Sequence, residues 1–298
     1  MTRLRIVQAV TSCYAPQYIA EELLHGEGFA EVHYVRVVPG GAQKALDTGE
    51  IDLTFQFAGP LIISVDAGNP IVMLAGGHID CFELFGNGRV RAIRDLKDKT
   101  VSVPALGSPQ HVFLASMAAY VGLDPRKDIH WVTYPRAEAM QRFTDGKLDA
   151  FLGLPPEPQE LRAKRIGHVV VNSIIDRPWP QYFCCLVVAN RTFVQRHPVA
   201  TKRTLRAILK AAHVCALEPE RVARVLVDKG YMTNYEYTLQ SVKEIPYGKW
   251  HEYDPEDTVR FYALRLHEVG MIKSTPQQII AQGTDWRFLN ELKRELKG

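Results

Sequence analysis

The regular alternation of short apolar runs with helical segments is the feature of this sequence that most constrains its fold. The first series predicts strands at 4–10, 32–38 and 52–57, helices at 16–25, 41–47 and 60–67, and a further strand at 71–75. Strands that alternate with helices in this way are typical of β-α-β units, in which successive strands run parallel. The pattern therefore predicts a largely parallel sheet with helices on its faces.

A second series of the same kind begins near Arg94. It predicts strands at 100–103, 129–133, 149–152 and 168–171 and helices at 109–121, 136–143 and 156–164. The segments 46–53 and 143–150 match most closely, because in each a glycine ends a helix and an apolar-Asp-apolar triplet begins a strand. Gly49 and Gly146 are 97 residues apart (146 minus 49). We expect two α/β lobes of similar design, which 298 residues comfortably supply.

The chain becomes helical after a long apolar strand predicted at 181–190. Helices are expected at 198–217, 220–229, 235–243, 255–269, 276–281 and 286–297. We expect this tail to return to the first lobe, so that residues 1–85 and 187–298 form lobe 1 and residues 86–186 form lobe 2. Two crossings, near 82–89 and 182–188, would then make a hinge.

Composition and charge exclude several classes of protein. Hydrophobic residues make up 46% and charged residues 23%, which are ordinary values for a globular chain. The net charge is only +3, and basic residues are not interleaved with aromatic ones, so we expect no nucleic-acid partner. No apolar run reaches the roughly 18 to 20 residues that span a bilayer. The N-terminal residues lack the zones of a signal peptide, so we expect either a cytoplasmic protein or an exported one whose signal was removed.

The cysteines predict neither a metal site nor a disulfide framework. There are five: Cys13, Cys81, Cys184, Cys185 and Cys215. Their number is odd, and their spacing does not form the paired motifs of zinc ligands. We therefore expect reduced thiols and no metal.

Four proline-containing loops follow predicted strands at the edge where α/β sheets bind ligands. They lie at 13–16, 57–60, 106–109 and 154–158, and each leads into a helix. Ser108 is a favoured N-cap and Pro109 a favoured first helical residue, and the backbone N–H groups of a helix start attract anions. We expect the four loops to converge on an interlobe cleft; the alternative is that they are ordinary α/β connections.

The side chains in and near these loops suit a small polar or flat solute. Tyr14 and Phe57 offer aromatic faces, amides and hydroxyls offer hydrogen bonds, and histidines can donate to an anion. The predicted ligand-binding residues are Cys13, Tyr14, Gln56, Phe57, Ala58, His78, Gly107, Ser108, Gln110, His111, Glu157, Phe183 and Cys184. Structural roles stay open: a core or surface position for either histidine, a helix-dipole role for Glu157 and core filling for Cys184.

Several segments resemble the substrate-binding proteins of ABC importers of the nitrate/sulfonate/taurine type, whose relatives include binders of thiamine pyrimidine precursors. These segments are 16–22, 49–53, 67–72, 93–103 and Gly107-Ser108. The resemblance implies a type II periplasmic-binding-protein fold whose two lobes close over a small anionic or heteroaromatic solute. It also implies a monomer without a cofactor, a periplasmic location and delivery of the solute to a membrane permease. It places Cys13, Tyr14, residues 56–58, His78, Gly107 and Ser108 in the pocket loops.

Two departures from this family keep other functions open. The sequence shows no export signal, and five cysteines are many for an oxidising compartment. Two enzymatic relatives share the fold. Aromatic sulfinate desulfinases use a cysteine placed much as Cys13 is, and pyrimidine synthases carry a cysteine-rich motif for which Cys184-Cys185 is too short. The alternatives are thus a cytoplasmic enzyme with Cys13 as nucleophile and a cytosolic sensor without a transporter.

Overall fold

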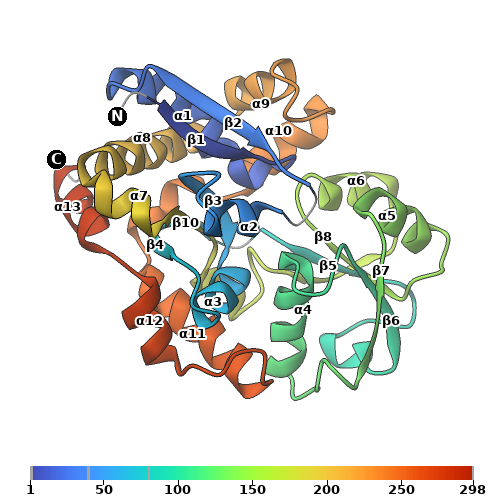
Figure 1. Cartoon of the computed structure of the whole chain (residues 1–298). Coiled ribbons are helices and arrows are strands. Elements are labelled where there is room, and N and C mark those ends of the chain that lie inside the picture. Colours follow the sequence, from blue (N-terminus) through green and yellow to red (C-terminus); the bar gives the residue numbers. More distant parts are fainter. Residues whose placement is uncertain (1–2, 39–40, 80, 297–298) are drawn as a thin grey trace.

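The chain forms two lobes, each built on a five-stranded sheet, in a computed structural model that describes residues 3–38, 41–79 and 81–296 (Figure 1). In lobe 1 the strand order is β2-β1-β3-β10-β4, and in lobe 2 it is β7-β6-β8-β5-β9. The strands of lobe 1 are β1 (Arg3–Gln8), β2 (Glu31–Arg36), β3 (Leu53–Phe57), β4 (Ile71–Ile79) and β10 (Phe183–Asn190). Those of lobe 2 are β5 (Glu83–Gly86), β6 (Lys99–Val103), β7 (Ile129–Thr133), β8 (Ala150–Gly153) and β9 (His168–Asn172).

Both sheets follow one plan. In lobe 1, β1 pairs in parallel with β2 and β3, while β10 runs antiparallel to β3 and β4. In lobe 2, β6 pairs in parallel with β7 and β8, while β5 runs antiparallel to β8 and β9. In each sheet, the strand next to one edge, β10 in lobe 1 and β5 in lobe 2, is therefore antiparallel to both of its neighbours. The predicted two-lobe α/β fold is confirmed. The sequence analysis missed β5, because its four residues are too few to show a strand period and its partners β8 and β9 lie far along the chain.

The matching glycine-aspartate segments have the same structural role in each lobe. Gly49 and Gly146 end helices with φ of +73° and +72°, a conformation that favours glycine. The carboxylate of Asp52 accepts the backbone N–H of Arg5 at 2.8 Å, and that of Asp149 accepts the backbone N–H of Thr100 at 2.9 Å. Each aspartate thereby satisfies a donor at the start of a neighbouring parallel strand, which explains why the segment occurs twice.

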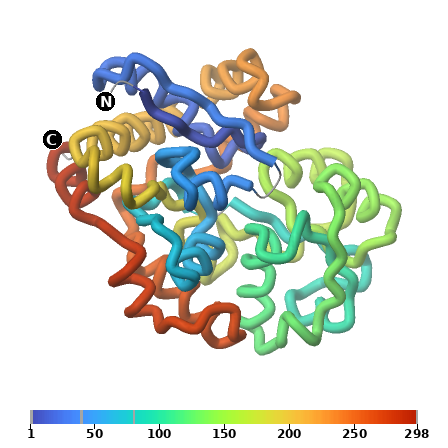
Figure 2. Tube along the Cα trace, viewed as in Figure 1, coloured from blue at the N-terminus to red at the C-terminus, as the bar shows by residue number. Residues whose placement is uncertain are grey.

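The helices mostly lie close to the predicted ranges. Around lobe 1 they are α1 (Ala15–Gly26), α2 (Ala42–Asp47), α3 (Ala58–Asp66), α7 (Arg191–Arg196), α8 (Pro198–Leu217), α9 (Pro219–Asp228), α10 (Tyr235–Glu244), α11 (Pro255–Glu268), α12 (Pro276–Gly283) and α13 (Arg287–Glu295). Lobe 2 carries α4 (Pro109–Tyr120), α5 (Arg136–Thr144) and α6 (Glu157–Lys164). Short 3-10 helices are η1 (Ser12–Tyr14), η2 (Ile93–Leu96), η3 (Trp179–Gln181) and η4 (Tyr247–His251). Figure 2 shows the C-terminal segment returning to lobe 1, where α8, α12 and α13 contact β4.

Strand β4 is longer than predicted. The strand pattern ended at Ala75, which put His78 in a following loop, but the structure continues the strand through Gly76 and Gly77 to Ile79. A Cβ at Gly76 would lie 2.3 Å from the ring of Phe183, and one at Gly77 would lie 2.1 Å from the ring of Phe55. The glycines are present because aromatic rings occupy the space of their side chains, and not because the chain turns there.

The lobes are joined by two chain crossings and by packing across their interface. The chain passes from lobe 1 to lobe 2 between β4 and β5 and returns between β9 and β10. The sequence analysis expected the crossings near 82–89 and 182–188. Phe57 of β3 contacts Phe113 of α4 and Tyr262 of α11, each with ring centroids 5.3 Å apart. The domain boundaries and the hinge motion stay predictions. Within the described ranges, no helix is both long and apolar enough to cross a membrane.

Candidate functional site

A cleft of about 540 Å³ lies between the lobes, at the carboxyl ends of β1, β3, β6 and β8. Lobe 1 contributes residues 7–11, 13, 14, 37, 38, 42, 43, 56, 57, 60, 184 and 185, lobe 2 contributes residues 104–110, 136 and 154, and the first crossing contributes residue 82. All four proline-containing loops therefore reach this cleft. Their convergence was the central expectation from the sequence, and the structure brings them together.

Eight of the predicted binding residues line the cleft: Cys13, Tyr14, Gln56, Phe57, Gly107, Ser108, Gln110 and Cys184. Ser108 is the N-cap of α4, as predicted, and its hydroxyl accepts the backbone N–H of His111 at 3.3 Å. The Tyr14 hydroxyl donates to Gln56 Oε1 at 3.1 Å, and burial raises the pKa of Tyr14 well above its ordinary value. The cleft therefore presents a neutral phenol and an amide from lobe 1 opposite a helix start from lobe 2.

Five predicted residues do not line the cleft. Ala58 and Phe183 are fully buried, and Phe183 fills the space beside Gly76. The His111 ring lies edge-on to Trp131, with centroids 4.8 Å apart, and burial lowers its pKa. Glu157 binds Arg136, and His78 lies in the thiol cluster described below.

Arg136 is the cationic side chain of the cleft that the sequence analysis missed. It begins α5, its Nε donates to Glu157 Oε1 at 2.9 Å, and its Nη2 donates to the carbonyl of Leu154 at 3.4 Å. Burial lowers the pKa of Arg136, but the Glu157 carboxylate more than compensates and raises it above its ordinary value. The guanidinium is thus held in place as a charged donor. Its signal in the sequence was its position just after strand β7.

Other polar contacts join the two lobes beside the cleft. The Thr11 hydroxyl donates to the carbonyl of Pro155 at 3.0 Å. Arg162 of α6 donates to both carboxylate oxygens of Glu244 on α10, at 2.8 and 2.6 Å. It also forms an ion pair of 3.2 Å with Glu83, whose side chain is only 2% exposed. The Thr11–Pro155 and Arg162–Glu244 contacts connect the two lobes in the conformation that the structure shows, whereas the Arg162–Glu83 ion pair lies within lobe 2.

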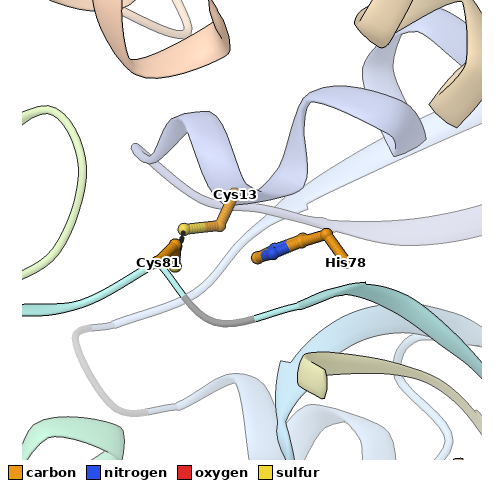
Figure 3. A group of neighbouring side chains, drawn as sticks. All are labelled: Cys13, His78 and Cys81. Atoms are coloured by element: carbon orange, nitrogen blue, oxygen red, sulfur yellow. Dashed lines mark hydrogen bonds between the residues drawn. The ribbon is translucent and has the colours of Figure 1, made fainter. Parts of the chain in front are cut away.

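Four buried thiols and one imidazole form a cluster that adjoins the cleft, and Figure 3 shows three of its members, Cys13, His78 and Cys81. Cys13 Sγ lies 3.0 Å from Cys81 Sγ, Cys81 Sγ lies 3.4 Å from Cys184 Sγ, and Cys184 Sγ lies 3.8 Å from Cys185 Sγ. The His78 ring joins them, since one of its nitrogens lies within 4.8 Å of both Cys13 Sγ and Cys81 Sγ. We call these five residues the thiol cluster.

The charges in the thiol cluster depend on each other. Burial raises the pKa of Cys13, but its hydrogen bond with Cys81 and the nearby His78 ring outweigh that effect and bring the pKa to about 5. Burial likewise lowers the pKa of His78, but the thiols of Cys185 and Cys13 raise it well above its ordinary value. Cys13 is therefore favoured as a thiolate beside an imidazolium. The sequence alone could not place a histidine against Cys13.

Comparison with known proteins gives similarity over most of the chain. A model described as the NMT1-like family matches residues 38–227. The bicarbonate-binding protein CmpA of Synechococcus elongatus is 27% identical over 125 residues, which cover 41% of this chain and 27% of CmpA. The matched part thus spans only about a quarter of the length of that curated relative.

Solved structures show the same fold at low sequence identity. The periplasmic nitrate-binding protein NrtA of Synechocystis PCC 6803 has a TM-score of 0.83 at 16% identity, covering 100% of this chain and 89% of that one. The alkanesulfonate-binding protein SsuA of Xanthomonas axonopodis pv. citri, solved with MOPS bound, has a TM-score of 0.75 at 16% identity, covering 96% and 99%. This chain therefore has the fold of periplasmic binding proteins.

Proposed function

The chain belongs to the NMT1-like family, and on that premise we propose that it is a solute-binding protein of an ABC importer. The observation that carries the proposal is the interlobe cleft, whose walls come from both lobes and include the half-buried guanidinium of Arg136. Two-lobe proteins of this kind close around their ligands by hinge motion. The relatives named above are binding proteins for bicarbonate, nitrate and alkanesulfonates, which are all oxyanions.

The cleft suits an organic anion. Arg136 and Ser108 supply donors, and Gln110 adds an amide from the start of α4. Phe57 and Phe82 supply aromatic surface on the same cleft. Its volume of about 540 Å³ falls in the range of pockets for whole organic ligands, whereas one water occupies only about 30 Å³ of liquid. We therefore favour a solute with an anionic group and a flat or heteroaromatic body over a bare inorganic ion.

The wider setting follows from the same proposal. The protein would act as a monomer in the periplasm and deliver its solute to a membrane permease. No cofactor takes part, since capture needs only closure and reversible contacts. The ligand-contacting residues would be Tyr14, Gln56, Phe57, Ser108 and Arg136, all of which line the cleft.

A thermal-shift screen over sulfonates, carboxylates, nitrate, bicarbonate and pyrimidines tests the proposal. A solute that binds only the native state raises Tm, by an amount that corresponds to about 2.7 kcal/mol at a hundred times Kd. The same solute should bind with about tenfold or greater loss of affinity to Arg136→Gln, because a charge-assisted hydrogen bond is removed. The matched control is Arg142→Gln, whose guanidinium lies on the same helix but pairs with Glu138 outside the cleft. Equal loss in both variants would contradict the assignment of Arg136.

One observation favours a second function, an enzyme that uses Cys13 as nucleophile. His78 lies beside Cys13, and the pKa of that thiol is about 5, as an activated thiolate requires. Against it, Cys13 is 0% exposed and its Sγ contacts Cys81. Under the transport proposal, Cys13→Ser still binds the solute unchanged. Consumption of a solute that stops in Cys13→Ser would establish the enzyme instead.

A further inference from the structure

The thiol cluster is a feature that solute capture leaves unexplained. Its members come from four places in the sequence: Cys13 in η1, His78 in β4, Cys81 in the first crossing and Cys184-Cys185 in β10. None is more than 3% exposed. Cys13, Cys184 and Cys185 also line the cleft, so the cluster adjoins the space from which a ligand would enter.

We propose that Cys13, His78 and Cys81 bind a thiophilic d10 metal ion, Zn²⁺ or Cu⁺, with Cys184 as a further ligand. Thiolate sulfur and imidazole nitrogen are the donors that these ions prefer, whereas Mg²⁺ and Ca²⁺ require oxygen ligands, which this set does not offer. The ligand atoms of Cys13, His78 and Cys81 lie within 4.8 Å of one another. One ion can therefore reach all three.

The distances agree with one shared ion after small side-chain rotations. Ligands about 2.3 Å from a tetrahedral ion lie about 3.8 Å from each other. The Cys81–Cys184 separation is 3.4 Å and the Cys13–Cys81 separation is 3.0 Å. An increase of less than about 1 Å in each of these two sulfur–sulfur distances gives the separation expected between ligands of a tetrahedral ion.

The His78 ring is already oriented as a metal ligand. Its Nδ1 lies 2.7 Å from the carbonyl of Ile79, to which it donates, so the other nitrogen is the one that can bind a metal ion, which displaces the proton of the imidazolium. Nε2 is buried and makes no hydrogen bond within the described ranges. A buried polar atom of this kind is costly unless it is satisfied, and a metal ion would satisfy it.

Charge balance supports a metal ion in such a buried place. Two thiolates and a neutral imidazole cancel the charge of Zn²⁺, and an uncompensated buried charge is strongly unfavourable.

The sequence analysis expected no metal because the ligands lie far apart in the sequence. Cys13 and His78 are 65 residues apart (78 minus 13), and Cys81 and Cys184 are 103 residues apart (184 minus 81). Zinc motifs in sequences rely on short spacings. Here only the fold brings the ligands together.

The test uses the full chain, reduced and freed of metal with a chelator under argon. Co²⁺ serves as the spectroscopic probe for the Zn²⁺ site, and Cu⁺ is titrated separately against a chromophoric Cu⁺ chelator. We expect one equivalent of Co²⁺ to produce a thiolate-to-metal charge-transfer band that Zn²⁺ removes, or one equivalent of Cu⁺ to leave the chelator. No solute is present, so the result does not depend on the proposed function.

Variants identify the ligands. Cys81→Ser and His78→Gln should each weaken metal binding by at least about tenfold. The control is Cys215→Ser, which changes a buried thiol of α8 outside the cluster and should bind as the wild type does. Circular dichroism shows that each variant is folded. The proposal is overturned if the reduced wild type binds neither ion, or if Cys215→Ser loses binding as much as Cys81→Ser.

Discussion

The Glu83→Gln variant offers a quantitative test of how the structure treats a buried carboxyl group of lobe 2. Glu83 begins β5, and its side chain is 2% exposed. Burial raises its pKa from 4.5 to about 7, although the nearby Arg162 lowers it in part. One carboxylate oxygen, Oε2, is buried and makes no hydrogen bond within the described parts of the chain. The native state therefore holds a carboxyl group that resists ionisation.

The sign of the effect on stability follows from proton binding. The folded-state pKa of Glu83 lies above the unfolded value, so between about pH 4.5 and 7 the native state holds a proton that the unfolded state has lost. Stability therefore falls as pH rises through this window. At about 1.4 kcal/mol per pH unit, the difference between 4.5 and about 7 corresponds to an upper value of about 3 kcal/mol. Glutamine imitates the protonated carboxyl and avoids this loss.

The assay is urea unfolding of wild type and Glu83→Gln at several pH values from 5 to 8. Near pH 5 the two free energies of unfolding should differ little, and near pH 8 the variant should be more stable by about 2 to 3 kcal/mol. Glu50→Gln, at an exposed position, controls for the removal of one negative charge. A difference between Glu83→Gln and wild type that stays constant with pH would refute the reasoning.

Two further predictions concern the cleft and the core. Ser108→Ala removes the N-cap hydroxyl that accepts the backbone N–H of His111, which should lower the free energy of unfolding by about 1 kcal/mol. The solute found by screening should also bind several-fold more weakly, because a polar group of the cleft is lost. Unchanged affinity in a calorimetric titration would show that Ser108 is not part of the site. Gly77→Ala places a Cβ 2.1 Å from the Phe55 ring and should cost about 2 kcal/mol or more, or prevent folding. Its control, Gly26→Ala, meets no atom within 4 Å, and thermal unfolding should show a change of less than about 1 kcal/mol; similar losses in both would contradict the packing argument.

Elements set by local chemistry could be predicted well from the sequence. Helix α8 begins at Pro198 and ends at Leu217, as the pattern predicted, because proline favours a helix start and the apolar period runs unbroken through the segment. The N-cap at Ser108 was found for the same kind of reason. Helix α7 (Arg191–Arg196) was missed, since its six residues directly follow β10 and are too few to show a helical period.

The candidate site was only partly visible. The turns that carry Cys13, Tyr14 and Gln56 could be placed at the carboxyl ends of strands, and the structure has them on the cleft. Arg136 follows strand β7, but that position alone does not separate it from a surface arginine, because the partner that holds its guanidinium in place is Glu157, 21 residues further on. His78 was assigned to a loop because Gly76 and Gly77 resemble a turn until the rings that fill their space are known.

Periodicity, capping residues and the repeated glycine-aspartate segments were enough, by themselves, to establish two α/β lobes and an edge where ligands would gather. These signals arise from neighbours within a few positions along the chain, so they survive without knowledge of the fold. The thiol cluster, the guanidinium of Arg136 and the raised pKa of Glu83 depend on groups that meet only after the chain has folded. Burial and electrostatic coupling act through space over a few ångströms, and only the tertiary structure decides which atoms come that close.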